Sequence, residues 1–272
     1  MNDGRLRLAY AGLHPDRLRD LTASRGLSGT LNGLVSGRIN TTDRVRDAVR
    51  IPAEERREQL ARAGIEALYK GDPGFPDLLA DLPDAPDVLF VRGVLPPFPG
   101  VAVVGARRCT SYGKRIARSY GRAIASAGWT VVSGLARGID GAAHQGTVDA
   151  AGAAVAVLGS GIDVMYPKEH GLLARQIISS GGAVVSEYPP GTPPEGWRFP
   201  PRNRVISGLS SAIVVVEATV KGGALITAEA ALRHGRQIFA VPGDVGRPTS
   251  EGCNLLIRDG AFPSLDTADL IE

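Results

Sequence analysis

Two adjacent arginines, Arg107 and Arg108, follow a short apolar strand that we predict over Val101–Val104. Gly105 ends this strand with the conformational freedom that a tight turn needs. A helix is predicted next, over Tyr112–Ala127. Guanidinium groups suit bidentate phosphate binding, and the first turn of a helix presents backbone N–H groups and the positive end of the helix dipole. The stretch therefore predicts an anion site in which Arg107 contacts phosphate.

The ends of this helix and the charge around it support that interpretation. Ser111 is the predicted N-cap and Gly128 the predicted C-cap. From Val101 through Ile139 there are seven Arg or Lys residues and no Asp or Glu. The net charge of the whole chain is only +3, but the basic excess lies after residue 99. This part of the chain should attract anions.

A second basic group lies in the sequence PPRNRVISG, where Arg202 and Arg204 flank Asn203. We interpret this segment as a loop directly before a helix or turn, and we expect both arginines to contact phosphate. Lys168 begins another predicted helix, where a cation is poorly placed relative to the dipole. That position leaves two alternatives open for Lys168, simple exposure or contact with a ligand.

Strands and helices alternate after residue 100, which predicts right-handed crossovers and a parallel sheet covered by helices on both faces. The expected strands are 101–104, 130–132, 153–158, 183–185, 212–216 and 237–241, and the expected helices are 112–127, 139–151, 169–180 and 223–233. This is an α/β, extended Rossmann-like fold. Ligands in such folds collect at the carboxyl ends of the strands.

The N-terminal part has a different pattern. Short amphipathic helices are expected over 17–24, 42–50 and 53–63, with glycines at 26, 29, 33 and 37 breaking the middle. Strands are expected over 65–69 and 88–91. We therefore divide the chain into a small helical N-terminal module, 1–64, and an extended Rossmann-like domain, 65–272.

The turns that follow the predicted strands are rich in glycine, which lets a ligand approach the backbone closely. In order they are GARRCTSYG, SGLARGID, GSGID, SEYPPG, EATVKGGALITAE and PGD. Besides the basic residues above and Asn203, the predicted site takes in Gly105, Ser111, Gly134, Arg137, Gly138, Asp140, Gly159, Lys221, Gly222 and Gly223.

The sequence lacks the usual motifs for binding a dinucleotide, a nucleoside triphosphate or zinc. The sequence after Gly105 does not give the dinucleotide fingerprint G-x-G-x-x-G, and no phosphate loop of the form G-x-x-x-x-G-K-[ST] occurs. No Cys/His cluster suggests zinc. We expect no catalytic residue, no metal and no cofactor.

We expect structural rather than catalytic roles for the acids and histidines near these turns. Paired carboxylates could do acid–base work, but no pair is set by spacing, so capping and pairing with arginine is the favoured interpretation. The acids concerned are Asp140, Glu187, Glu217 and Glu229. The histidines at 144, 170 and 234 share no motif and are taken as structural.

No apolar run approaches the ~20 residues needed to span a bilayer, and the N-terminus lacks a signal-peptide core. Cys109 and Cys253 make no disulfide framework and are expected as reduced thiols. These features favour a soluble, cytoplasmic protein with no membrane partner.

From about Tyr69 to Ala261 the chain resembles the DNA-processing protein A family, also called DprA or Smf. Six ordered blocks carry the resemblance: VVGARRCTSYG, VVSGLARGIDGAAHQGT, VAVLGSGIDVMYP, VVSEYPPGTPP, FPPRNRVISGLSSAIVVVEATVKGGALITAEAALRHGRQIFAVPGD and SEGCNLLIRDGA. The resemblance implies a homodimeric, non-enzymatic protein that binds and protects single-stranded DNA and helps load the RecA recombinase in natural transformation and recombination.

The resemblance also implies particular residues and domains. It assigns phosphate contacts to Arg107, Lys168, Arg202 and Arg204, while Ala106 replaces the usual turn serine. It implies an N-terminal module that is SAM-like or helix-hairpin-helix-like. Many members add a C-terminal winged helix, which we expect to be missing from a chain that stops at residue 272.

One alternative function stays open. KGGALITAE, at 221–229, is similar to the G-G-x-G-T-x-x-E loop of nucleoside-monophosphate phosphoribohydrolases, in which the glutamate, here Glu229, works on the ribose. Leu225 stands in place of the second turn glycine. If the ligand is instead DNA, an aromatic content of 5% predicts binding dominated by electrostatics rather than by extensive base stacking.

Overall fold

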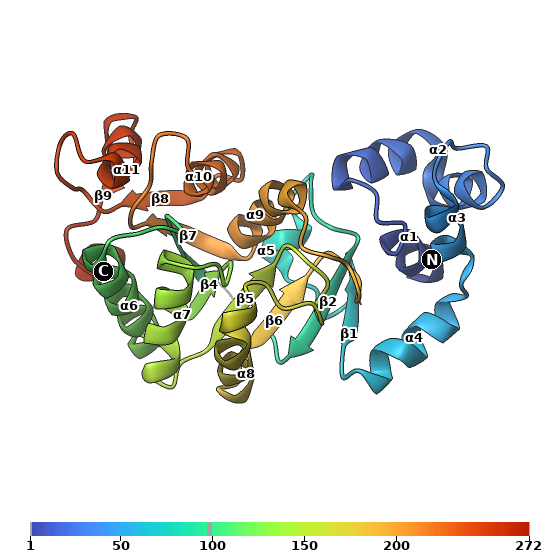
Figure 1. Cartoon of the computed structure of the whole chain (residues 1–272), viewed down its shortest axis with the longest axis horizontal. Coiled ribbons are helices and arrows are strands. Elements are labelled where there is room, and N and C mark those ends of the chain that lie inside the picture. Colours follow the sequence, from blue (N-terminus) through green and yellow to red (C-terminus); the bar gives the residue numbers. More distant parts are fainter. Residues whose placement is uncertain (1, 97–99, 272) are drawn as a thin grey trace.

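The computed structural model describes residues 2–96 and 100–271. Four helices come first, followed by a sheet whose strands mostly alternate with helices (Figure 1). The strands are β1 (Glu66–Tyr69), β2 (Val88–Gly93), β3 (Gly100–Val104), β4 (Thr130–Ser133), β5 (Ala154–Leu158), β6 (Ala183–Ser186), β7 (Ser210–Val215), β8 (Gln237–Ala240) and β9 (Phe262–Pro263). The α-helices are α1 (Asn2–Ala9), α2 (Pro15–Val35), α3 (Asp43–Arg50), α4 (Ala53–Arg62), α5 (Asp77–Ala80), α6 (Ser111–Ser126), α7 (Ile139–Asp149), α8 (Gly171–Ser179), α9 (Phe199–Gly208), α10 (Gly223–Arg233), α11 (Pro248–Arg258) and α12 (Ala268–Ile271), and two short 3₁₀ helices are η1 (Lys168–His170) and η2 (Gly196–Arg198).

The described strands form one sheet in the order β1-β2-β6-β5-β4-β3-β7-β8-β9. β1, β2 and β6 pair antiparallel, and every other neighbouring pair is parallel. The chain moves from β3 outward through β4, β5 and β6, and then returns to place β7 on the other side of β3. The predicted α/β fold with a mostly parallel sheet is confirmed, and its topological switch point lies between β3 and β7.

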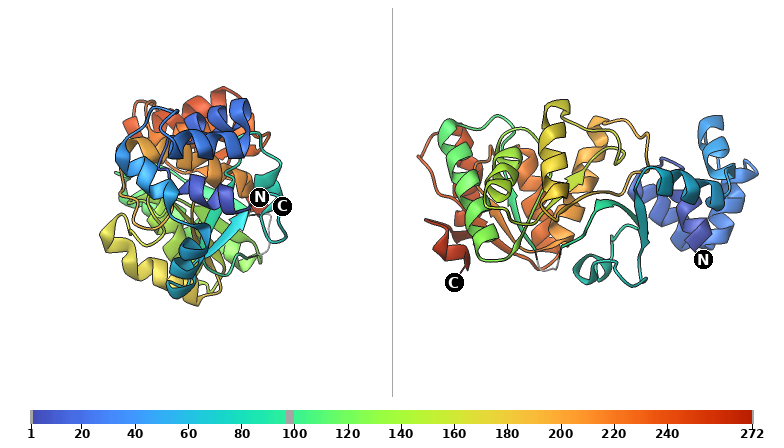
Figure 2. Two further views of the ribbon diagram at one scale, coloured as in Figure 1. Left: turned by 90° about the vertical axis from the view of Figure 1, so that its right-hand side faces the viewer. Right: turned by 90° about the horizontal axis from the view of Figure 1, so that it is seen from below.

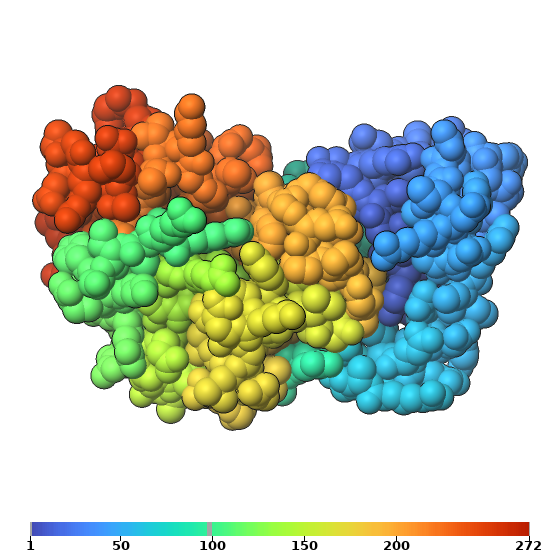
Figure 3. Space-filling view, in the orientation of Figure 1, coloured from blue at the N-terminus to red at the C-terminus, as the bar shows by residue number. Residues whose placement is uncertain are grey.

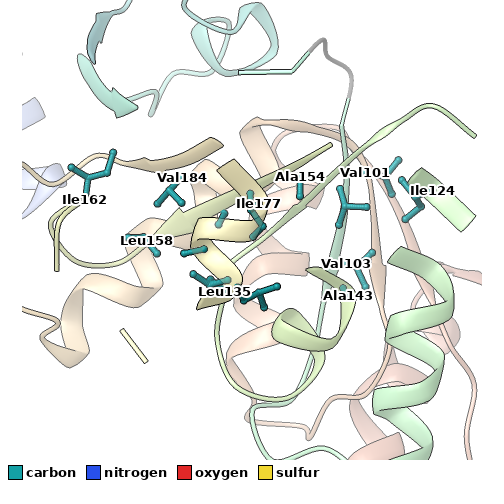
Figure 4. Packing of buried hydrophobic residues seen from close by; sticks show 14 of the residues in the cluster. Val101, Val103, Ile124, Leu135, Ala143, Ala154, Leu158, Ile162, Ile177 and Val184 are labelled. Carbon is teal, nitrogen blue, oxygen red and sulfur yellow. The ribbon is translucent and has the colours of Figure 1, made fainter. Parts of the chain in front are cut away.

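Two hydrophobic cores lie on the two faces of the sheet because successive side chains of a strand point to opposite faces. In β3, Val101 and Val103 pack on the α6, α7 and α8 side, whereas Ala102 and Val104 pack on the α9, α10 and α11 side. Figure 4 shows the first of these cores, with Ile124 of α6 and Ile177 of α8 among its members. Burial on both faces explains why these strands are continuous apolar runs.

The N-terminal helices lie at one end of the molecule and the last helices at the other (Figures 1 and 2). Leu6 of α1 and Leu60 of α4 join the core on the β1–β2 end of the sheet, whereas α2 and α3 share a small core of their own around Leu34 and Val49. The division of the chain at residue 64 stays a prediction.

The N-terminal module differs from expectation in two ways. Helix α1 was not expected, although its Leu6 and Leu8 are buried. The glycines do not all break the middle, because α2 continues through Gly29 and Gly33 and is interrupted only at Gly26, which has φ 66°. Gly33 lies within this helix, and its missing side chain leaves room for Ile39, which a Cβ would approach to 2.7 Å.

The predicted cap of α6 is corrected by one residue. Thr110, not Ser111, is the N-cap, and its hydroxyl accepts a hydrogen bond from the Gly113 N–H at 3.0 Å. At the other end, Ala127, not Gly128, is the C-cap, and Gly128 follows it with φ 80°, the position at which a glycine commonly ends a helix. Among the described residues, no helix has the length and apolar character required to cross a bilayer.

Candidate nucleic-acid interface

The loops that follow β3 and β7 border a cleft of about 440 Å³ at the switch point of the sheet. Both loops leave neighbouring parallel strands at their carboxyl ends, which is where this class of fold binds ligands. We call it the main cleft, and its lining includes Gly105, Ala106, Arg107, Arg108, Ala136, Asp140, Arg202, Asn203, Thr219, Gly222, Gly223 and Thr227. In Figure 3 the green segment that contains the loop after β3 runs as a ridge across this face, below the orange part of the chain.

A smaller pocket of about 140 Å³ adjoins the main cleft and shares Arg107, Arg108, Ala136 and Arg202 with it. We call it the adjoining pocket. Its remaining lining is Gly134, Arg137, Gly159, Tyr166, Pro167 and Phe199. The rings of Tyr166 and Phe199 lie 5.6 Å apart. A basic cleft thus continues into a pocket with two aromatic side chains.

Arg107 and Arg202 reach this region from different elements and have different environments. Arg107 is exposed on the loop after β3, and its guanidinium lies over the Phe199 ring, 4.7 Å from the centroid. Arg202 is buried in α9, where it donates hydrogen bonds to the carbonyls of Gly134, at 2.7 Å, and Val157. Burial, opposed by the charge of Asp140 and assisted by that of Arg107, lowers the pKa of Arg202 to about 10. Two cations therefore converge on one site.

Asp140 is the acid of the main cleft. It lies in the first turn of α7, and its carboxylate accepts a hydrogen bond from the Gly134 N–H at 3.1 Å. Burial raises the pKa of Asp140, while the positive charges of Arg202 and Arg107 oppose that rise. The residue holds the loop after β4 against α7, but it does not cap that helix.

The start of α6 already holds a carboxylate, which disfavours the anion site expected at that helix start. The carboxylate of Glu217 occupies it, accepting from the Thr110 N–H at 2.8 Å and from the Thr110 hydroxyl at 2.5 Å. The helix N-terminus that borders the main cleft is that of α10, through Gly222 and Gly223. No side chain among the described residues caps α10.

The structure brings most of the predicted site residues together. The two pockets include Gly105, Arg107, Arg108, Gly134, Arg137, Asp140, Gly159, Arg202, Asn203, Gly222 and Gly223. Within the described part of the chain, the remaining predictions lie outside both linings: Ser111, Gly138, Lys168, Arg204 and Lys221.

Three of those five residues are close neighbours of the site. Gly138 packs against the carbonyl of Ala106, Lys168 is exposed beside Pro167, and Lys221 is exposed beside Gly222. Arg137 does line the adjoining pocket, but it already pairs with Glu169 at 2.5 Å.

Arg204 does not form a second wall of the cleft. The segment predicted as a loop is helix α9, and Arg204 lies on another side of it from Arg202. There it is buried, forms an ion pair with Glu187 and donates to the carbonyl of Asp84. Residues two apart on a helix do not share a face, so only one arginine of this pair can face the cleft.

Beside Arg204 lies a Ser–His–Asp arrangement. The Ser207 hydroxyl is 2.7 Å from His234 Nδ1, and His234 Nε2 is 3.2 Å from Asp84 Oδ1. Ser207 is fully buried, so no substrate can reach its hydroxyl. The arrangement links α9, α10 and the segment before β2, and it gives His234 the structural role expected from the sequence.

The sequence reasoning missed the aromatic lining. Phe199 is the first residue of α9 and Tyr166 precedes a cis proline, Pro167, before η1. The signal was present in the sequence FPPRNR, in which the phenylalanine stands three residues before Arg202 and therefore on the same side of a helix. Interpreting the segment as a loop hid this relation.

The phosphoribohydrolase alternative depends on Glu229. Glu229 is exposed on α10, outside the lining of both pockets in the described chain, and pairs with Arg233 at 2.7 Å. Among the described residues, no group of three or more His, Cys, Asp or Glu side chains is arranged to hold a metal ion.

A family model described as DNA recombination-mediator protein A matches residues 66–272. Protein Smf of Escherichia coli K12 is 45% identical over 199 residues, which cover 72% of this chain and 53% of that protein. DNA processing protein DprA of Bacillus subtilis is 39% identical over 212 residues, which cover 77% and 71%. The chain spans about half the length of the Smf proteins of E. coli and Synechocystis.

Two solved structures share the architecture. The X-ray structure of DNA processing protein A from Streptococcus pneumoniae has a TM-score of 0.77 and 30% identity, covering 97% of this chain and 95% of its own. The second is a structure of DNA processing protein A from Helicobacter pylori that concerns its mode of binding single-stranded DNA. It has a TM-score of 0.66 and 26% identity, and the match covers 76% of this chain and 94% of the other.

Proposed function

This chain belongs to the DNA recombination-mediator protein A family, and on that basis we propose that it binds single-stranded DNA through its phosphates in the main cleft. The observation that carries the proposal is the convergence of Arg107, Arg108 and Arg202 beside the uncapped start of α10. Arg107 and Arg108 form no ion pair with any described residue, so their charges are available to an anion.

A single strand fits this geometry better than a duplex does. The main cleft and the pocket that contains Tyr166 and Phe199 meet at Arg107, Arg108 and Arg202, which line both. A flexible strand can place phosphates against the arginines and an unpaired base near the rings, whereas paired bases are not free to turn outward. Contacts to phosphate carry no sequence information, so we expect little sequence preference. The solved structure of DNA processing protein A from H. pylori concerns the binding of the same class of ligand, single-stranded DNA.

The proposal extends to the partners. We propose that the chain acts as a homodimer and helps load RecA onto the strand that it holds, in recombination and natural transformation. Family membership supports this extension. The test is RecA filament formation on a strand coated with single-strand binding protein, with and without this chain. Unchanged nucleation would remove RecA loading from the proposal and leave DNA binding in place.

The DNA-binding proposal is tested by fluorescence anisotropy with a labelled thymidine oligonucleotide of about 20 nucleotides, titrated between about 50 and 200 mM salt. Binding should weaken steeply as salt rises, and unlabelled single strands should compete better than duplexes of the same length. A lack of binding at low salt, or a preference for duplex, would overturn the proposal. Release of free adenine from AMP, lost in Glu229→Ala, would place the phosphoribohydrolase alternative first.

A further inference from the structure

Glu217 stands where two loops of the site meet. It follows β7, is 5% exposed, and directs its carboxylate to the start of α6. Its own backbone carbonyl accepts a hydrogen bond from the Ala106 N–H at 2.7 Å. The same residue therefore binds both ends of residues 106–110, which we call the arginine loop.

The carboxylate contacts form a chain of hydrogen bonds. Glu217 accepts from the Thr110 backbone at 2.8 Å and from the Thr110 hydroxyl at 2.5 Å, and that hydroxyl accepts from the Gly113 N–H at 3.0 Å. A Cβ at Gly113 would lie 2.5 Å from the carboxyl carbon, so a glycine is what lets the acid approach the helix. A carboxylate at this position is also stabilised by the helix dipole.

The middle of the arginine loop lacks equivalent support. Arg107 touches the Phe199 ring, and Arg108 is exposed, but neither forms an ion pair with a described residue. The direction in which the two guanidinium groups point therefore depends on the anchored ends of the loop, on Gly138 packed against its backbone and, for Arg107, on the Phe199 ring.

We propose that Glu217 is a positioning residue for phosphate binding: it holds the arginine loop so that Arg107 and Arg108 project into the cleft. The inference rests on the proposed function. It gives a role to an acid that would otherwise be unfavourable in an anion site, because its negative charge repels phosphates.

Repulsion of phosphates by Glu217 would lower DNA affinity, whereas positioning of the arginine loop would raise it. Substitutions of Glu217 can therefore separate the two effects. If the residue only repels DNA, then removing its charge in any way should strengthen binding. If it positions the loop, Glu217→Ala should weaken binding although a negative charge is lost. Glu217→Gln keeps an oxygen that can accept from the Thr110 N–H and an amide N–H that can donate to the Thr110 hydroxyl, so it should bind at least as tightly as the unaltered chain.

The experiment measures the dissociation constant of a labelled thymidine oligonucleotide for the full chain and its variants at one low salt concentration. We expect Glu217→Ala to weaken binding by about tenfold, a factor comparable to the loss of a helix cap. Glu217→Gln should restore or exceed the original affinity. Glu229→Ala, which removes an exposed acid outside both pockets, controls for the change in net charge and should differ by less than about twofold. Stronger binding by both Glu217 variants would overturn the proposal.

A double-mutant cycle with Arg107→Ala tests whether Glu217 acts through the loop. In the Arg107→Ala background, Glu217→Ala should cause a smaller loss than it does alone. Equal losses in the two backgrounds would contradict positioning of Arg107. Thr110→Val removes the hydroxyl but keeps the backbone N–H, and it provides a second variant if Glu217→Ala does not fold. It should weaken binding by a smaller factor than Glu217→Ala. Unchanged affinity of Thr110→Val would count against the proposal.

These outcomes separate the inference from the proposed function. If the unaltered chain does not bind single strands, the proposed function fails first. If it binds, and Arg107→Ala weakens binding while Glu217→Ala does not, only the positioning role of Glu217 is lost.

Discussion

The guanidinium of Arg107 lies over the ring of Phe199, 4.7 Å from its centroid, although the two residues are far apart in the sequence. The contact joins the loop after β3 to the start of α9. Arg202 also approaches this ring, at 5.9 Å. One aromatic side chain thus lies beside two cations that repel each other, and an anion bound between them would relieve that repulsion.

Arg107→Ala should weaken binding of single-stranded DNA and reduce its dependence on salt. Removing one phosphate contact from a single strand should flatten the slope of log K against log salt by about 0.7. Anisotropy titrations at several salt concentrations measure that slope. Arg233→Ala is the matched control, because Arg233 is exposed, paired with Glu229 and outside both pocket linings within the described chain. An unchanged slope for Arg107→Ala would move the site elsewhere.

Phe199→Leu should weaken binding without altering net charge. Leucine keeps an apolar side chain but loses the π-face over which Arg107 lies, and cation–π contacts at exposed sites are worth about 0.5–1 kcal/mol. If a base also stacks on the ring, the loss should reach about 1–3 kcal/mol. Affinity for an oligonucleotide reports the part of these contacts that strengthens on binding, and the salt slope should stay constant because no phosphate contact is removed.

Arg202→Met should lower the stability of the fold and not only the affinity for DNA. The buried guanidinium satisfies the carbonyls of Gly134 and Val157 and lies near the buried Asp140. Removing one member of such a set costs about 3–5 kcal/mol in the free energy of unfolding, measured by urea denaturation. Adding Asp140→Asn should recover part of that loss. A single variant as stable as the unaltered chain would contradict a structural role for Arg202.

Gly138→Ala should disturb the site, whereas Gly128→Ala should not. Both glycines have φ 80°, a region that residues with a Cβ rarely adopt, so both substitutions carry backbone strain. A Cβ at Gly138 would lie 2.3 Å from the carbonyl oxygen of Ala106, while a Cβ at Gly128 meets no described atom within 4 Å. Only Gly138→Ala should therefore shift the arginine loop and lower DNA affinity. Equal affinities in the two variants would count against this coupling.

His144 should make stability depend on pH in the acid range. It is fully buried on α7, and burial lowers its pKa from 6.5 to about 3. Between those values the unfolded chain binds a proton that the folded chain does not, so this residue costs about 1.4 kcal/mol of stability for each pH unit below 6.5. Urea unfolding between pH 5 and 7 should show a shallower decline in His144→Leu. Parallel curves for the two proteins would refute the assignment.

The sequence predicted the architecture well because its signals are local. Apolar runs such as Val101–Val104 must be buried on both faces, and their alternation with helices leaves a parallel sheet as the solution. The carboxyl edge of such a sheet is the expected ligand site, and the main cleft lies there.

The segment at 199–208 shows where local signals were insufficient. Its prolines and arginines suggested a loop, but two prolines at the start of a helix are compatible with its first turn. Once the segment is helical, Arg202 and Arg204 point to different sides, and only Arg202 reaches the cleft. A linear pattern treats two arginines as equivalent when helical geometry separates them.

By itself, the sequence determined the fold class, the edge of the sheet that carries the cleft and the basic loop beside it, since strand burial and turn chemistry act over a few residues. The tertiary structure decided which helix start faces the cleft. Glu217 places its carboxylate at the start of α6 from 107 positions away along the chain, whereas the start of α10 borders the cleft. Which carboxylate meets which helix depends on the pairing of β3 with β7, a contact between distant segments that no local pattern encodes.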